Sequence, residues 1–265
     1  MKIIHLSDTH INPETLNKID TQQRFKLALN HIRDNHSNAD ILIITGDLTA
    51  FGDDESYQIF NRTLKEAILP DHLYPKLILG NHDDRENFKK NFPNIKIDQN
   101  GFVQYSLNFG DKTFIFLDTN LSGTHAGHLC EKRQTWLIET LKKEQENKIY
   151  LFMHHNPLAL GQIKSDALGL VQRNEFKKIL LQFQNSIQHI FFGHQHITSS
   201  GKYLGITFSS PRSTWQPLVP NFSEKFRLGK ADTDPNYNVI LITEDSLIVH
   251  TEDFLKTKVN WFEGE

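Results

Sequence analysis

Residues 74–83 read Tyr-Pro-Lys-Leu-Ile-Leu-Gly-Asn-His-Asp, a short apolar run followed by a glycine turn. The run predicts a buried β-strand over residues 74–79, and the turn places Asn81 and His82 just beyond the carboxyl end of that strand. An amide oxygen and an imidazole nitrogen are both metal-ligand types. The stretch therefore predicts metal-type ligands at the end of a strand.

Four other apolar runs end in the same way, at Asp8-Thr9-His10, Gly46-Asp47, His154-His155 and Gly193-His194-Gln195-His196. Each motif alone has an ordinary interpretation as a turn, a cap or a structural histidine. Their occurrence at five strand ends indicates one shared site. Because the ligands are carboxylate, imidazole and amide groups without a thiolate, they favour Mn, Fe or Zn over a structural thiolate zinc site.

The amino-terminal third has a β-α-β-α-β order, which predicts parallel strands with helical crossovers. Strands are expected at 2–7, 41–44 and 74–79, with amphipathic helices at 21–35 and 54–67. In such sheets, ligands gather outside the carboxyl ends of the strands. Asp8, Asp47 and Asn81 are all predicted to lie there.

The pattern changes after a short helix expected at 85–91. An antiparallel hairpin is predicted around Gly110-Asp111, and a second around Glu244-Asp245. The expected elements are strands at 103–109, 112–118, 149–153, 190–192, 206–210, 239–243 and 247–250, and a helix at 130–146. We expect one domain over residues 1–265, built from two packed sheets with outer helices, with an accessory tail from about 251 to 265.

Length and composition are those of one globular domain with a sizeable core: 265 residues, 38% hydrophobic and 23% charged. The net charge of -3 predicts no general attraction to nucleic acid or to an anionic membrane. Cys130 is the only cysteine, so no intramolecular disulfide can form. The first motif begins at Asp8 and no apolar run reaches the length of a membrane span, so we expect no signal peptide and a cytoplasmic location.

The ligand set predicts phosphoester hydrolysis at two metal ions. Asp47 is the expected carboxylate bridge, since two ions roughly 3.5–4 Å apart can bind phosphate oxygens and hold a bridging hydroxide for in-line attack. His82 stands beside a ligand, and we expect it to protonate the leaving oxygen while Asp83 orients its imidazole and raises its pKa. Asp8 and His10 are expected on the turn beyond the first strand.

The motifs D-x-H, G-D, G-N-H-D, H-x-(N/P)-P and G-H-x-H, in this order from Asp8 to about residue 243, resemble the signature of the calcineurin-like metallophosphoesterases. The resemblance implies a four-layer αββα sandwich of two mixed β-sheets flanked by helices, and a metal-dependent phosphodiesterase. It implies two metal ions, one held by Asp8, His10, Asp47 and His196, and the other by Asp47, Asn81, His154 and His194. It implies catalytic roles for His82, as proton donor, and Asp47, and substrate contacts from His10, Asp47, Asn81, His82 and His196.

Finer features resemble the class III cyclic nucleotide phosphodiesterases: Gly46-Asp47-Leu48-Thr49, residues 166–170, and Ser213-Thr214-Trp215-Gln216. Asn156 departs from the H-H-P-P run usual there, which affects the expected pocket wall. The implied substrate is a small phosphodiester such as cyclic AMP. Two loops, 158–172 and 211–230, are expected to select it, the second through Arg212, Trp215, Phe222, Phe226 and Arg227. That loop could instead pack onto the domain or form a homodimer interface.

Other functions in the same superfamily stay open as alternatives. A glycerophosphodiesterase, or another small phosphodiester or pyrophosphate hydrolase, is the main one; pyrophosphohydrolases of the lipid A pathway usually carry Arg at the position of His82. A scaffold like the retromer subunit lacks the catalytic histidine, and repair nucleases carry extra DNA-capping domains and a basic groove. Six of the other histidines are assigned to ordinary surface or core positions: His5, His31, His36, His72, His189 and His250.

Overall fold

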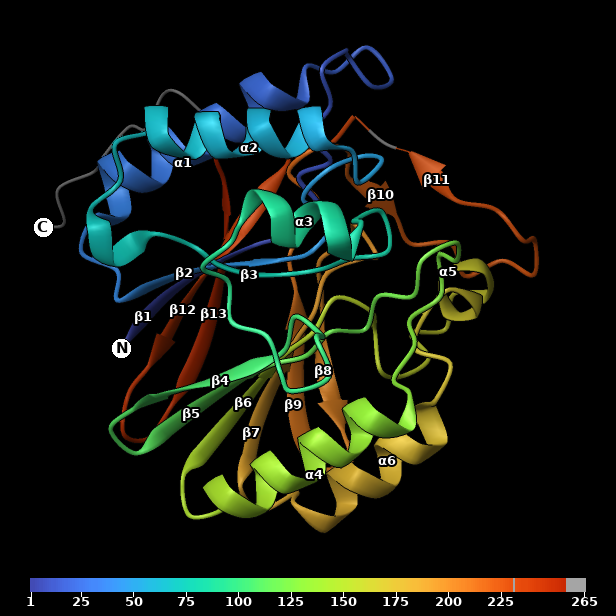
Figure 1. Cartoon of the computed structure of the whole chain (residues 1–265). Helices are drawn as coiled ribbons and strands as arrows, with labels where there is room; N and C mark the ends of the chain where they lie inside the picture. Colours follow the sequence, from blue (N-terminus) through green and yellow to red (C-terminus); the bar gives the residue numbers. More distant parts are fainter. Residues whose placement is uncertain (231, 256–265) are drawn as a thin grey trace, which may run out of the picture.

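The computed structural model describes residues 1–230 and 232–255, which form four layers: helices, sheet, sheet, helices (Figure 1). One sheet has the strand order β13-β12-β1-β2-β3 and the other β4-β5-β6-β7-β9-β8. Both sheets mix parallel and antiparallel pairs. The αββα fold expected from the sequence is confirmed. Of the proposed tail, residues 251–253 continue the last strand, and 256–265 lie outside the described residues.

The first sheet is built around three parallel strands, β1 (Lys2–Leu6), β2 (Ile41–Thr45) and β3 (Lys76–Ile78). The crossovers are α1 (Thr21–His36) and α2 (Asp54–Glu66), and they lie on the outer face of this sheet (Figure 1). The hairpin of β12 (Asn236–Ile242) and β13 (Leu247–Asp253) adds to β1 antiparallel. Every residue of β2 is buried, because helices cover one face and the second sheet covers the other.

The second sheet opens with the predicted hairpin of β4 (Tyr105–Phe109) and β5 (Lys112–Phe116). Its parallel part is β5, β6 (Lys148–Phe152), β7 (Ile187–Phe191) and β9 (Ile206–Ser210). Helices α4 (Glu131–Glu144) and α6 (Arg173–Gln182) cover its outer face (Figure 1). Stacked rings of Phe116, Phe152 and Phe191 line its inner face. The ring centroids of Phe116 and Phe152 are 5.1 Å apart, and those of Phe152 and Phe191 are 4.7 Å apart.

Several elements were not predicted. They are β8 (Ser199–Tyr203), which pairs with β9, helix α6, and the short elements η1 (Asp71–Leu73), α5 (Ile163–Ala167), β10 (Leu218–Val219) and β11 (Gly229–Lys230). Helix α3 (Arg85–Asn91) has the predicted bounds. Within residues 1–230 and 232–255, no helix is both long and apolar enough to cross a membrane.

The topology places all five motifs at one edge of the sandwich. They follow the carboxyl ends of β1, β2 and β3 in one sheet and of β6 and β7 in the other. Because these strands are parallel within each sheet, their ends meet on one side. The two sheets therefore supply the opposite walls of a single site.

Candidate metal centre

The first group of side chains is Asp8, His10, Asp47 and His196, whose ligand-type atoms all lie within 4.8 Å of one another. The Nε2 atoms of His10 and His196 are 3.1 Å apart. Asp8 Oδ1 lies 3.2 Å from His196 Nε2, and Asp47 Oδ2 lies 3.5 Å from His10 Nε2. All four residues are buried. The structure thus brings together the four residues implied for one metal ion.

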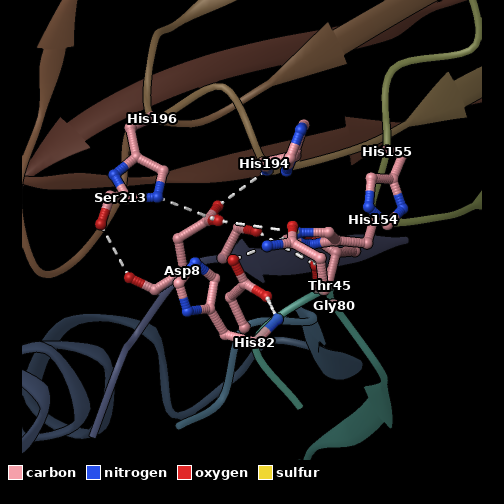
Figure 2. A network of polar contacts seen from close by, with 12 residues as sticks. Asp8, Thr45, Gly80, His82, His154, His155, His194, His196 and Ser213 are labelled. Atoms are coloured by element: carbon pink, nitrogen blue, oxygen red, sulfur yellow. Dashed lines mark hydrogen bonds and ion pairs between the residues drawn. The ribbon is translucent and has the colours of Figure 1, made fainter. Parts of the chain in front are cut away.

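The second group surrounds His154, whose Nε2 lies 3.4 Å from Asp47 Oδ2 and 3.2 Å from Asn81 Oδ1. The ring of His194 packs against that of His154 with centroids 5.1 Å apart. Asp47 Oδ2 therefore lies between the two groups, facing His10 on one side and His154 on the other. Figure 2 shows His196 on one side of the network, His154 and His155 on the other, and His194 between them.

The backbone at the centre adopts a conformation that non-glycine residues rarely take. Asp8, His10, Asp47, His194 and His196 have φ angles of 57°, 45°, 48°, 68° and 54°. A left-handed residue costs roughly 1–2 kcal/mol, and such residues cluster at functional sites. The expectation that Asp8 and His10 lie on a turn beyond the first strand is confirmed, because β1 ends at Leu6 and both residues are left-handed.

Glycine is required where two of these turns meet. A Cβ at Gly80 would lie 2.2 Å from Asp47 Oδ1, and one at Gly46 would lie 2.5 Å from the backbone nitrogen of Gly80. The close approach lets the His82 backbone N–H donate to Asp47 Oδ1 at 2.8 Å. The backbone N–H of His194 holds Asp8 Oδ2 in the same way at 3.0 Å. Each carboxylate thus keeps its other oxygen for the centre.

Two imidazoles of these two groups have a tautomer fixed by a backbone carbonyl. His154 Nδ1 donates to Thr45 O at 2.7 Å, and His196 Nδ1 donates to Gln216 O at 2.8 Å. In both rings, Nε2 is therefore the nitrogen directed at the carboxylates. Such a bond on the second nitrogen is the usual partner of a metal-ligating histidine.

The protonation states suit a cation site. Burial opposes ionisation of Asp47, but His154 and His82 hold the pKa of its carboxyl well below its usual range. Burial, helped by neighbouring histidines, lowers the pKa of His194 to about 3 and that of His10 well below normal, so both are neutral. For His154, burial is outweighed by Asp47 and Asp8, which raise its pKa to about 9.

These observations test whether the residues fit metal ions. Asp8 Oδ1 is buried and has no hydrogen-bond partner among the described residues. The Nε2 atoms of His196 and His154 face it at 3.2 and 4.0 Å, and a carboxylate and imidazoles are groups that bind metals once deprotonated. The donors are oxygen and nitrogen atoms, as for Mn, Fe and Zn. The geometry therefore supports two divalent metal ions that share Asp47.

The expected partnership of His82 and Asp83 is wrong. His82 Nδ1 donates instead to the carbonyl of Ala50 at 2.8 Å, which leaves Nε2 as its free nitrogen. The buried Asp83 carboxylate accepts from the backbone N–H groups of Gly80 and Leu48, at 2.9 and 3.1 Å. Adjacent residues of a tight turn point apart, so Asp83 supports the turn and does not contact the imidazole of its neighbour.

Three further residues of the site had no predicted role. His155 packs against His194 with centroids 4.6 Å apart and bonds Thr119 Oγ1 through Nδ1 at 2.7 Å. Ser213 Oγ donates to Asp8 O at 2.7 Å. His125 lies beside Asn81 and His82. The adjacent His154 was the only sequence signal for His155, and for His125 there was none.

Of the two loops expected to select the substrate, the second is partly bonded into the centre and also contacts the first. Residues 213–218 are bonded into the centre, for example through Leu218 N and His196 O at 3.0 Å. Trp215 is half-buried and its ring lies 4.7 Å from that of His10. Arg212, which was expected to contact a substrate, forms an ion pair with Asp253 at 3.1 Å. Lys164 of the other loop lies over the ring of Phe226 at 5.4 Å, so the loops meet.

Comparison with known proteins agrees with this geometry. The model of the calcineurin-like phosphoesterase family matches residues 1–198. A probable cyclic nucleotide phosphodiesterase of Rhodopseudomonas palustris is 28% identical over 260 residues, which cover 96% of this chain and 93% of the relative. The probable glycerophosphodiester phosphodiesterase GpdQ of Arcobacter nitrofigilis is 30% identical over 218 residues, 80% of this chain and 78% of the relative.

Among solved structures, a dimetal phosphatase from Danio rerio has a TM-score of 0.70 and covers 96% of each chain at 11% identity, a likeness of fold. Fold and ligand set together define a metal-dependent phosphoesterase. The chain belongs to the calcineurin-like phosphoesterase family. The expected class, a metal-dependent phosphodiesterase, is confirmed.

Proposed function

We propose that the protein hydrolyses small phosphodiesters at two metal ions, one held by Asp8, His10, Asp47 and His196 and the other by Asp47, Asn81, His154 and His194. The observation that carries this proposal is the position of Asp47 Oδ2, 3.5 Å from His10 Nε2 and 3.4 Å from His154 Nε2. When bound, two ions neutralise the phosphate and activate water for in-line attack. Mn, Fe and Zn all suit these ligands.

The residues around the ions have separate tasks in this proposal. His82 is the proton donor: its Nδ1–H is bonded to Ala50 O, and in the imidazolium form its Nε2–H gives the proton that the leaving oxygen receives, leaving a neutral ring. The backbone N–H of His82 holds the Asp47 carboxylate, so the proton donor and the shared carboxylate keep the same relative position. His10, Asn81 and His196, together with Asp47 and His82, line the position of the phosphate.

The proposed substrates are 3',5'-cyclic nucleotides such as cyclic AMP. Trp215, beside His10 at the centre, offers an aromatic surface for a base, and stacking on an aromatic side chain stabilises a bound base by about 1–3 kcal/mol. The similarity to a probable cyclic nucleotide phosphodiesterase supports this substrate class. The similarity to a probable glycerophosphodiester phosphodiesterase favours glycerophosphodiesters as the second candidate.

A substrate panel tests the proposal. Purified protein loaded with Mn²⁺ or Zn²⁺ is given cyclic AMP, a glycerophosphodiester, a nucleoside diphosphate ester and a phosphomonoester under identical conditions. We expect the diesters to be cleaved faster than the monoester, and cyclic AMP to have the highest kcat/KM. Ready cleavage of glycerophosphodiesters with cyclic AMP untouched would replace the first candidate by the second.

A further inference from the structure

His125 contacts Asn81 on the exposed side of the centre. It stands in the connection between β5 and α4, and its exposed ring lies 5.1 Å from that of His82, centroid to centroid. Its Nδ1 is 3.0 Å from Asn81 Nδ2. The amide of Asn81 therefore has one partner on each side, His125 outside and His154 inside.

The chemistry of this contact fixes its direction. An amide NH₂ can only donate, so Nδ1 of His125 is the acceptor and its ring proton is on Nε2. With the NH₂ bonded to His125, Asn81 Oδ1 is turned toward His154 and Asp47. A flipped amide would direct its NH₂, which cannot bind a cation, at the metal ligands. The contact with His125 thus anchors the NH₂ on the outer side while the amide oxygen faces the centre.

The segment that carries His125 is itself held in place. Gly127 N–H donates to Gly169 O at 3.2 Å, and Val171 N–H donates to Gly127 O at 2.8 Å. A Cβ at Gly127 would lie 2.5 Å from the His155 ring, so only glycine allows this close approach. His128, one residue beyond, points elsewhere and its Nε2 lies 3.1 Å from Gln172 Nε2. His125 is thus presented to Asn81 by a fixed backbone.

We propose that His125 is a positioning residue that orients the amide of Asn81 and thereby strengthens binding of the second metal ion. This rests on the proposed role of Asn81 as a ligand. Groups that orient a metal ligand typically change metal affinity by about 10–100-fold. Loss of the acceptor leaves Asn81 free to rotate, while the ion held by Asp8, His10 and His196 keeps all its ligands.

The test measures Zn²⁺ retained per chain when loaded protein is equilibrated in buffers of decreasing free Zn²⁺. His125→Ala should release one of its two ions at a free concentration roughly 10–100-fold higher than wild type, with the other ion unchanged. His125→Asn should restore retention, since its Oδ1 can replace Nδ1 as the acceptor. His128→Ala is the matched control and should behave as wild type.

Two results would overturn the inference: His125→Ala retaining both ions as wild type does, or His125→Asn losing an ion as readily as His125→Ala. In a double-variant cycle, His125→Ala should add nothing to Asn81→Ala, because it acts through that residue; additive losses would also contradict it. Measurements on the wild-type protein distinguish a failure of this inference from a failure of the proposed function. If wild type itself binds fewer than two ions or cleaves no phosphodiester, the proposed function fails.

Discussion

The metal centre and residues 219–230, which we call the arm, are joined in sequence but differ in structure. In the centre, four of the five left-handed residues are buried, His194 is half-buried, and the two carboxylates are held by backbone N–H groups. In the arm, the side chains of Phe222 and Phe226 are 75% and 59% exposed. The comparison leads us to expect that backbone geometry fixes the centre and that side chains of the arm can be changed without disturbing it.

Replacing Asp47 should have the largest effect, because it removes the carboxylate shared by both groups. Asp47→Ala is expected to lose both ions and to lower kcat/KM by more than the roughly 10²-fold typical of changes around a ligand. Chelation should lower the Tm of wild type, since metal bound only to the native state stabilises it. The Tm of Asp47→Ala should change little on chelation, because the variant has already lost its ions. Elemental analysis and thermal melts check this, and a variant that keeps two ions would contradict the sharing of Asp47.

Replacing His82 should separate proton donation from metal binding within the centre. His82→Ala is expected to keep both ions and to lower kcat by roughly 10²–10⁴, the range for a lost general acid. The loss should be smaller for a nitrophenyl diester, whose leaving group needs little protonation. Equal losses for good and poor leaving groups would instead assign His82 to phosphate positioning.

Trp215 lies at the boundary between the two regions and tests where selectivity begins. If it stacks a base, Trp215→Ala should raise KM for cyclic AMP by about tenfold, as expected for a lost contact of 1–3 kcal/mol, and scarcely change turnover of a small synthetic diester. Because its ring also contacts His10, metal content must be measured in parallel. A similar loss with both substrates would show that Trp215 acts on the centre and would remove the base-stacking role.

A buried histidine outside both regions provides a reference for stability. Burial lowers the pKa of His189 to about 3, and its ring bonds Thr207 and Ser209. Because this lies below the unfolded value near 6.5, its stabilising contribution is complete above pH 6.5 and is lost as the pH falls toward 3. Relative to His189→Gln, wild type should lose about 2 kcal/mol of unfolding free energy between pH 7 and pH 5.

Denaturant unfolding at both pH values measures this difference, with the exposed His250→Gln as the control for changing a surface histidine. A difference between wild type and His189→Gln that does not change with pH would show that the ring is not held neutral by burial.

Changes in the arm should have the smallest effect. Phe222→Ser and Phe226→Ser are expected to change the unfolding free energy by no more than about 0.5 kcal/mol, as for exposed positions, and to leave metal content unaltered. Turnover of the small diester should also be unaltered. Loss of metal from either variant would show that the arm and the centre are coupled, and the contrast between them would fail.

The sequence could predict an element when the element has an apolar pattern of its own. Strand β2 was clear because Ile41–Thr45 is an uninterrupted apolar run, and the ligand motifs were clear because they follow such runs. The β8 segment, Ser199–Tyr203, has no apolar pattern and becomes a strand only by pairing with β9. Helix α6 was missed although Phe176, Ile179 and Leu180 have helical spacing.

Within the site, tertiary contacts decided what the sequence could not. Asp83 was assigned to His82 because the two are adjacent, yet the turn directs its carboxylate to the backbone of Leu48. His125 and His155 belong to segments whose positions follow from packing, including the close approach of Gly127. Residue types and strand ends could be read locally, whereas partners contributed by other loops could not.

The central claim, that two metal ions share Asp47, is tested most directly by the metal content of fully active wild-type protein. Elemental analysis combined with an active-site titration gives the number of ions per active chain. The account predicts two ions, with activity lost and regained in step with their removal and return. A fully active preparation with at most one ion per chain would contradict it.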